Sequence, residues 1–85
     1  MEVEAQLRDV LADVLSLGAR AGRLTRESPL LGAVPELDSM AVVSVIAAIE
    51  DRFGITVDDD EVSGRTFATF GSLVEFVSAK SGLAA

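Results

Sequence analysis

Ser39 is the residue of this chain whose type and neighbours most directly suggest chemistry. It stands in the run Asp38-Ser39-Met40, at the predicted start of a helix. A serine at a helix start can carry a phosphodiester, because free backbone N–H groups and the helix dipole stabilise negative charge there. Serine and aspartate are also good helix N-caps, so the same residues have a purely structural interpretation.

The side chains that would turn Ser39 into a catalytic nucleophile are missing from the sequence. There is no histidine and no cysteine, which are the usual general base and thiol nucleophile. The only lysine is Lys80, and neither a Ser–Lys spacing nor a G-x-S-x-G elbow surrounds Ser39. A chain of 85 residues also leaves little room for a desolvated cleft that would separate the pKa values of paired carboxylates. We therefore do not expect an enzyme.

The acidic run that begins at Asp58 is the feature most similar to a metal site. An EF-hand loop starting there would need glycine at its sixth position and glutamate at its twelfth. Those positions hold Ser63 and Thr69. We therefore expect no metal site, and we interpret Asp58 and Glu61 as a capping box at the start of a short helical turn.

Charge and hydropathy limit the class of protein further. The formal net charge is −7, which disfavours a nucleic-acid partner and favours partners with basic surfaces. The richest apolar stretch, residues 40–49, is roughly half as long as a membrane span must be. The acidic N-terminus lacks the pattern of a signal peptide. We expect a cytoplasmic protein that does not insert into a membrane.

Apolar residues at helical spacing predict three main helices, over about residues 3–17, 39–53 and 70–81, and one short helix over 59–63. Thr69 is the predicted N-cap of the last helix, and glycines are predicted to end the main helices. The apolar stripes are Leu7, Val10, Leu11 and Val14, then Val42, Val45, Ile46, Ile49 and Phe53, then Phe70, Leu73, Val74 and Val77. The helix-ending glycines are Gly18, Gly54 and Gly82.

A long first connection, residues 18–37, shows no sustained periodicity. We expect apolar side chains to pin it to the core, and a short turn to begin at Ser28-Pro29. The pinning residues are Leu30, Leu31 and Val34. Together these elements predict an all-α four-helix bundle, folded as one monomeric domain over residues 1–85.

A second apolar row on the helix 39–53 consists of Met40, Val43 and Ala47. A helix that is apolar on more than one face either is buried on both or presents an interaction surface. The sequence pattern alone does not distinguish between these two interpretations of the row.

Residues 36–55, ELDSMAVVSVIAAIEDRFGI, resemble the modification site of acyl carrier proteins and of related peptidyl carrier domains. The triplet Asp38-Ser39-Met40 is similar to the family's Asp-Ser-hydrophobic motif, and residues 49–55 are similar to its apolar–acidic–acidic–x–Phe run. Residues 56–77 are similar to the family's short third helix, the threonine that follows it and the last helix. The resemblance covers nearly the whole chain.

The resemblance implies a four-helix bundle of the acyl-carrier type and a covalent cofactor. A phosphopantetheinyl transferase would attach the 4′-phosphopantetheine arm of coenzyme A to Ser39, beside Asp38 and Met40, and the thiol of the arm would hold acyl groups as thioesters. The protein would receive them from an acyl-loading ligase or synthase and deliver them in fatty-acid, polyketide or other specialised acyl metabolism. The expected partner-binding residues are Met40, Val43, Ala47, Glu50 and Asp51.

Several positions depart from the pattern of the fatty-acid carriers. Ala41, Val42 and Ser44 stand at positions that are often acidic there, and Leu37 stands where glycine is common. The departures suggest a carrier dedicated to a specialised pathway. A peptidyl, aminoacyl or D-alanyl carrier is an alternative, as is a non-covalent helical adaptor in which Ser39 is only an N-cap. The small residues Ala47 and Ala48 are expected to leave room for an acyl chain to enter the core.

Overall fold

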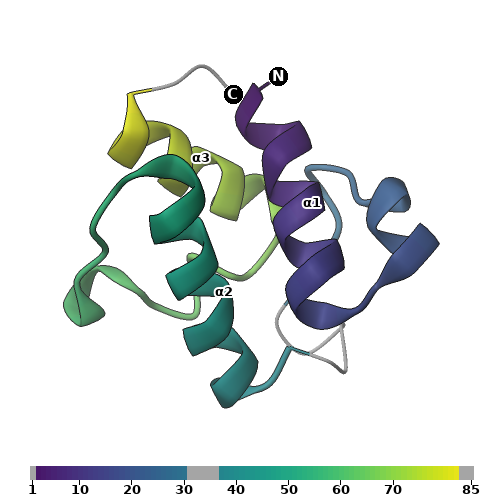
Figure 1. The fold of residues 1–85 in the computed structure, drawn as a ribbon, viewed down its shortest axis with the longest axis horizontal. Helices are drawn as coiled ribbons and strands as arrows, with labels where there is room; N and C mark the ends of the chain where they lie inside the picture. Colours follow the sequence, from purple (N-terminus) through teal and green to yellow (C-terminus); the bar gives the residue numbers. More distant parts are fainter. Residues whose placement is uncertain (1, 31–36, 83–85) are drawn as a thin grey trace.

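The structure, a computed structural model, describes residues 2–30 and 37–82. This part of the chain is helical and contains no β-strand, as predicted. In Figure 1, α1 lies between η1 on one side and α2 and α3 on the other, and it packs against all three. The elements in chain order are α1 (Glu2–Leu15), the 3-10 helix η1 (Gly18–Arg23), α2 (Ser39–Phe53), the 3-10 helix η2 (Asp59–Glu61) and α3 (Phe70–Ser81).

The predicted bounds of α2 and α3 are confirmed, and the reason is local capping. Thr69 forms a capping box with Ser72, in which each side chain accepts a hydrogen bond from the backbone N–H of the other. At the ends of the two helices, Gly54 and Gly82 take left-handed conformations with φ of 65° and 75°. The short element η2 is a single 3-10 turn that ends at Glu61, so the predicted extent of 59–63 was too long.

The predicted end of α1 was also wrong, because the helix stops at Leu15 and not at residue 17. Ser16 takes the left-handed conformation, with φ of 54°. The N–H of Leu17 then donates a 3.1 Å hydrogen bond to the carbonyl oxygen of Ala12, as in a Schellman motif. This turn buries Leu17 in the core, and that burial offsets the cost of a left-handed conformation at a residue other than glycine.

The long first connection contains a 3-10 helix that the pattern did not predict. The six residues Gly18–Arg23 present only one buried side chain, that of Ala21, so they have no apolar stripe that could indicate a helix. The helix η1 packs against α1 (Figure 1). The chain therefore returns along α1 before it crosses to α2.

Residues 28–30 of the connection are held to the start of α3 by backbone hydrogen bonds. Pro29 forms an isolated antiparallel bridge with Thr69, and the carbonyl oxygen of Ser28 accepts a 2.8 Å hydrogen bond from the N–H of Phe70. The predicted short turn does not begin at Ser28-Pro29 itself, because these backbone groups pair with the start of α3, and the residues into which it would continue, from 31, lie outside the described residues. Leu30 is fully buried, which confirms it as a pin. The other two predicted pins, Leu31 and Val34, lie outside the described residues.

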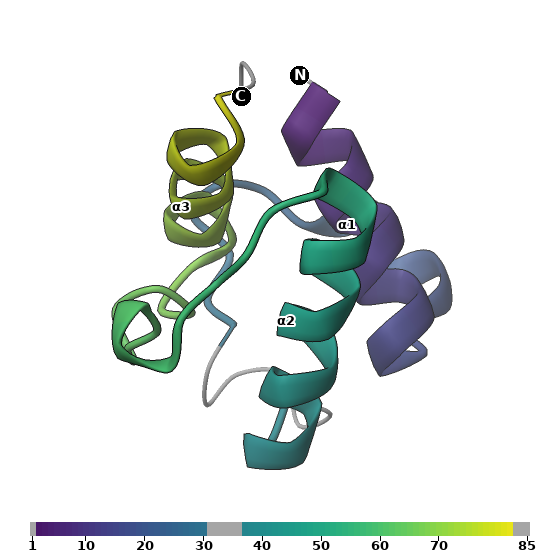
Figure 2. The ribbon, with the colours of Figure 1, turned by 60° about the vertical axis from the view of Figure 1, so that its left-hand side comes forward.

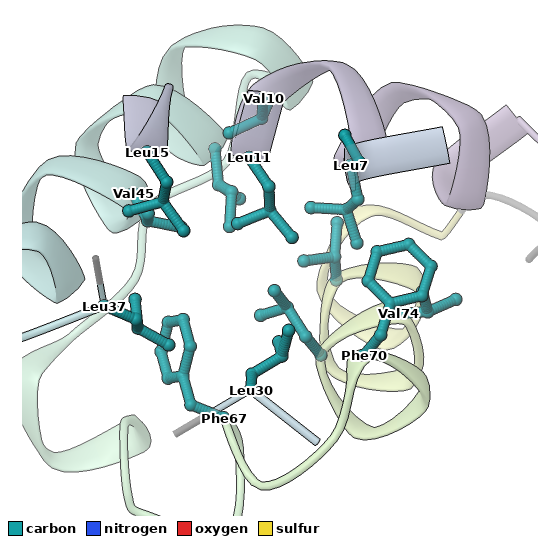
Figure 3. Packing of buried hydrophobic residues seen from close by; sticks show 14 of the residues in the cluster. Leu7, Val10, Leu11, Leu15, Leu30, Leu37, Val45, Phe67, Phe70 and Val74 are labelled. Atoms are coloured by element: carbon teal, nitrogen blue, oxygen red, sulfur yellow. The ribbon is translucent and has the colours of Figure 1, made fainter. Parts of the chain in front are cut away.

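One apolar core joins the three α-helices to the connection. In Figure 3 the side chains of Leu7 and Leu11 of α1 point toward Leu30 and toward Phe67, which precedes α3. The buried residues of α2 and α3 in this cluster are Val45, Ile49, Phe70, Leu73, Val74 and Val77. The core therefore covers one face of α2 and leaves Met40 and Val43 exposed on another.

Candidate functional site

Asp38 is the N-cap of α2. Its backbone is extended, and its side-chain Oδ1 accepts a 2.8 Å hydrogen bond from the N–H of Ala41. Its carbonyl oxygen accepts the first intrahelical hydrogen bond, from Val42. Leu37, the preceding residue, is 5% exposed and packs in the core together with the partly buried Val42, as in a hydrophobic staple. The leucine that departs from the carrier pattern thus anchors the chain immediately before Ser39.

Ser39 is the first helical residue of α2, so the interpretation that it is itself the N-cap was wrong. Its side chain is exposed, and its hydroxyl forms no hydrogen bond to any other described residue. The N–H groups of Ser39 and Met40 lie in the first turn, where a helix offers no carbonyl partner, while the N–H of Ala41 is occupied by Asp38. A nucleophilic oxygen therefore lies beside two N–H donors at the positive end of a helix of 15 residues.

The apolar row Met40, Val43 and Ala47 faces solvent. Met40 is 78% exposed and Val43 is 67% exposed, and among the described residues these are the large hydrophobic side chains at the surface. Ala47 is exposed as well. The interpretation of the row as ordinary core packing was therefore wrong, and an unpartnered apolar surface adjoins Ser39 along α2.

A hollow of about 380 Å³ lies beside this surface. Because Val43 and Ala47 line it and are exposed, the hollow opens to solvent. Ala48, also expected to make room for cargo, does not line the hollow; one residue further along the helix, it turns toward the core and packs there. The lining residues are Val42, Val43, Ile46, Ala47 and Glu50 from α2, with Val57 and Val62 from the following segment.

The far wall of the hollow is the segment 55–62, which leaves the end of α2 and passes to the side of α3 (Figure 2). Glu50 reaches this wall: its Oε2 accepts a 2.8 Å hydrogen bond from the N–H of Val57. Glu50 is half-buried, whereas Asp51 beside it is exposed. Of these two acidic residues, both expected to bind partners, Asp51 is the one whose side chain faces solvent.

Glu61 connects the same wall to α3. The Nζ of Lys80 lies 2.9 Å from Oε1 and 2.8 Å from Oε2 of Glu61, and the N–H of Asp58 donates to Oε1 at 2.9 Å. The lysine first, and then the Asp58 N–H, lower the pKa of Glu61 below its ordinary value. The predicted capping box is present in one half, in which Glu61 accepts from the Asp58 backbone.

Lys80, Val57 and Val62 are site residues that the sequence analysis did not identify. No local sequence pattern indicates Lys80, because it lies nineteen positions after Glu61 and contacts it only in the folded chain. Among residues 2–30 and 37–82, no cluster of three or more acidic side chains is placed to hold a metal ion. None of the helices in this described part is both long enough and apolar enough to cross a bilayer.

Comparison with known proteins gives consistent matches. The family model for the phosphopantetheine attachment site matches residues 5–77. The chain is 36% identical to the acyl carrier protein MbtL of a Mycobacterium species, over 92% of this chain and 82% of that protein. It is 35% identical to the acyl carrier protein of Acidothermus cellulolyticus over 51% of this chain, a match that spans about half (49%) of that relative. The solution structure of a holo acyl carrier protein from Nitrosomonas europaea superposes with a TM-score of 0.84 at 56% identity, covering 93% of this chain and 94% of the other.

Proposed function

Because the chain belongs to the phosphopantetheine-attachment family and is an acyl carrier protein, we propose that Ser39 carries its covalent 4′-phosphopantetheine arm. The observation that supports this assignment most strongly is the state of the Ser39 hydroxyl. It is exposed, it forms no hydrogen bond to another described residue, and it stands directly after the N-cap Asp38. The fold has no structural use for this oxygen, which leaves it available to a modifying enzyme.

The residues around Ser39 suit a phosphodiester. The N–H groups of Ser39 and Met40 and the dipole of α2 stabilise negative charge at the start of the helix. Asp38 fixes the register of that start by holding the N–H of Ala41. Leu37 anchors the preceding backbone in the core, so the serine is presented from a rigid position.

Attachment requires an enzyme other than this chain. The Ser39 oxygen attacks the phosphorus that links the arm to the rest of coenzyme A, and the new phosphodiester forms as the adenosine-bearing phosphate leaves. The hydroxyl proton passes to a base of the phosphopantetheinyl transferase. When bound, the arm supplies the thiol that holds acyl groups as thioesters, which a chain without cysteine cannot supply itself.

The surface beside Ser39 is the proposed docking face for the transferase and for the enzymes that load and unload the cargo. Met40 and Val43 provide exposed apolar area, and Asp51 provides charge further along the same helix. The net charge of −7 steers the chain toward basic patches on these enzymes. Ala41, Val42 and Ser44 stand at positions that are often acidic in the general fatty-acid carriers, so the start of α2 carries less negative charge here than in those proteins. We therefore propose a carrier dedicated to a specialised acyl pathway.

The intact mass of the protein tests the assignment. After incubation with coenzyme A and a promiscuous transferase, the chain should gain one phosphopantetheine, and Ser39→Ala should gain none. Ser44→Ala is the matched control, since Ser44 is an exposed serine on the same helix and should not affect the gain. Failure of the unaltered chain to gain mass with several transferases would refute the proposal.

The mass of protein purified from its native host then identifies the cargo. An acyl group on the arm supports the proposal, whereas an aminoacyl group would assign the chain to the peptidyl or aminoacyl carriers. A non-covalent adaptor would carry no arm, and its activity would survive Ser39→Ala. The N-cap role that this alternative gave to Ser39 belongs to Asp38.

A further inference from the structure

The segment 55–62, the far wall of the hollow, is held to the bundle at two points. We propose that its fastening by the Glu61–Lys80 ion pair determines how long an acyl chain the hollow admits, an inference that rests on the proposed acyl cargo. The wall meets α2 through Glu50 and Val57, and it meets α3 through Glu61 and Lys80. The helices α2 and α3 each pack on α1, and this segment runs from the end of α2 toward the side of α3 (Figure 2).

The contact with α2 lies at the near end of the wall. The Glu50 carboxylate accepts the Val57 N–H at 2.8 Å, and the Val57 side chain is only 9% exposed. The backbone carbonyl oxygen of Glu50 also accepts a 3.2 Å hydrogen bond from the N–H of Ile55, which holds the chain where it leaves α2. This end of the wall is therefore fixed by backbone and side-chain bonds together.

The contact with α3 lies at the far end, beside Val62. Both oxygens of Glu61 are within 2.9 Å of the Lys80 Nζ. The side chains are 28% and 32% exposed, so solvent screens the pair only in part. Glu61 also accepts the N–H of Asp58, which ties the whole turn to the lysine. The lowered pKa of Glu61 agrees with a carboxylate that is held in its charged form.

The turn η2, at the far end of the wall, adds little rigidity of its own. The turn η2 has three residues, too few to be stable as a helix alone. It is not among the elements that pack closely on α1. The neighbouring Val62 is partly buried against the core, and its side chain also lines the hollow. The far end of the wall, which is held by this ion pair and by the partial burial of Val62, can move outward while the core of the three helices stays packed.

Removing the lysine charge should therefore widen the hollow at the Val62 end and leave the Val57 end in place. The variant Lys80→Met keeps an apolar stem of similar length and deletes the charge. Arg52→Met is the matched control: it also removes one cation, from the Arg52–Asp9 ion pair between α2 and α1, and neither residue lines the hollow. Lys80→Arg restores a cation to the pair.

The first measurement uses the unmodified chain and needs no cofactor. We expect the amide hydrogen of Asp58 to exchange about tenfold faster in Lys80→Met than in the unaltered chain, because its acceptor Glu61 is released. Arg52→Met should not change this rate, and Lys80→Arg should restore it. An unchanged rate in Lys80→Met would show that the ion pair does not fasten the wall.

The second measurement loads Ser39 with butyryl, octanoyl, dodecanoyl or hexadecanoyl arms and compares each melting temperature with that of the holo form. As the acyl group lengthens, the melting temperature should rise and then level off. In Lys80→Met it should level off at a longer acyl group than in the unaltered protein or in Arg52→Met. We expect the longest arm to add roughly 4 °C more in Lys80→Met than in the unaltered chain. Identical chain-length profiles would refute the inference and leave the carrier function intact. Absence of any arm on Ser39 would instead refute the proposed function, while the exchange rates would still report on the fastening.

Discussion

The N–H of Gly71, in the first turn of α3, donates a 2.9 Å hydrogen bond to the carbonyl oxygen of Arg26 in the long connection. A Cβ atom at Gly71 would lie 2.6 Å from that oxygen, so no side chain fits between the two segments. Arg26 also lies 3.5 Å from Glu4 of α1 and 3.4 Å from Glu75 of α3. Arg26 thus holds the connection that leads to Ser39 against both α1 and α3.

We expect Gly71→Ala to destabilise the protein by about 1–3 kcal/mol, because the backbone of the connection must shift to admit the methyl group. Urea unfolding of the purified variant measures this loss. Gly22→Ala is the control, since nothing lies within 4 Å of the Cβ position at Gly22. Equal stabilities of the two variants would contradict the close approach of Gly71 to Arg26.

Asp38→Ala is expected to lower the free energy of unfolding by about 1 kcal/mol, because the N–H of Ala41 loses its acceptor. Asp38→Asn should retain most of the stability, since an amide oxygen caps equally well. Ser39→Ala should change the stability by less than about 0.5 kcal/mol, because the hydroxyl it removes is exposed and unbonded among the described residues. Thermal unfolding measures the loss of stability in each variant. A larger loss in Ser39→Ala than in Asp38→Ala would show that Ser39, and not Asp38, caps the helix.

Val43→Asp tests the exposed apolar row as a docking face. We expect kcat/KM for attachment of the arm by a transferase to fall roughly tenfold, since a charge replaces an apolar contact in the proposed interface. The stability of the chain should hardly change, because Val43 is 67% exposed. Ala79→Asp adds the same charge at an exposed position of α3 and should leave the rate unchanged. If both variants slowed attachment equally, net charge and not this face would be responsible.

The Glu61–Lys80 pair predicts a specific dependence of stability on pH. Lys80 holds the pKa of Glu61 below its ordinary value of 4.5, so the pair stabilises the fold above that pH. The contribution is lost as the pH falls through the lowered pKa of the folded state, where the carboxylate takes up a proton. Glu61→Gln should therefore be less stable than the unaltered chain at neutral pH, and the difference should vanish in acid.

Unfolding curves of Glu61→Gln and of the unaltered chain, recorded from neutral to acidic pH, measure this difference. Lys80→Met should lose most of the same pH dependence, because it removes the group that lowers the pKa of Glu61 most and leaves only the Asp58 N–H to lower it. A difference between Glu61→Gln and the unaltered chain that stayed constant across the range would mean that the carboxylate charge does not contribute through this pair.

The helices α2 and α3 were predictable from the sequence because the signals that begin and end them are local. Thr69 caps the residue three positions after it, and Gly54 and Gly82 adopt left-handed conformations that most residues avoid. The spacing of apolar side chains then assigned one face of each helix to the core, and Val45, Ile49 and Leu73 are buried there. The resemblance around Ser39 was visible for the same reason, since the residues that carry it are contiguous.

Only the tertiary structure decided which neighbour of the helix start acts as its cap and which apolar residues of α2 face solvent. Asp38 and Ser39 have similar capping propensities, and the burial of Leu37 fixes the register in favour of Asp38. Met40 and Val43 are as apolar as the core residues, and they are exposed because no described element covers that face. The wall of the hollow likewise depends on Glu61 and Lys80, which are distant in the chain. Capping and periodicity act within a few residues and can be recognised in one segment, whereas exposure and ion pairing depend on what the rest of the chain places nearby.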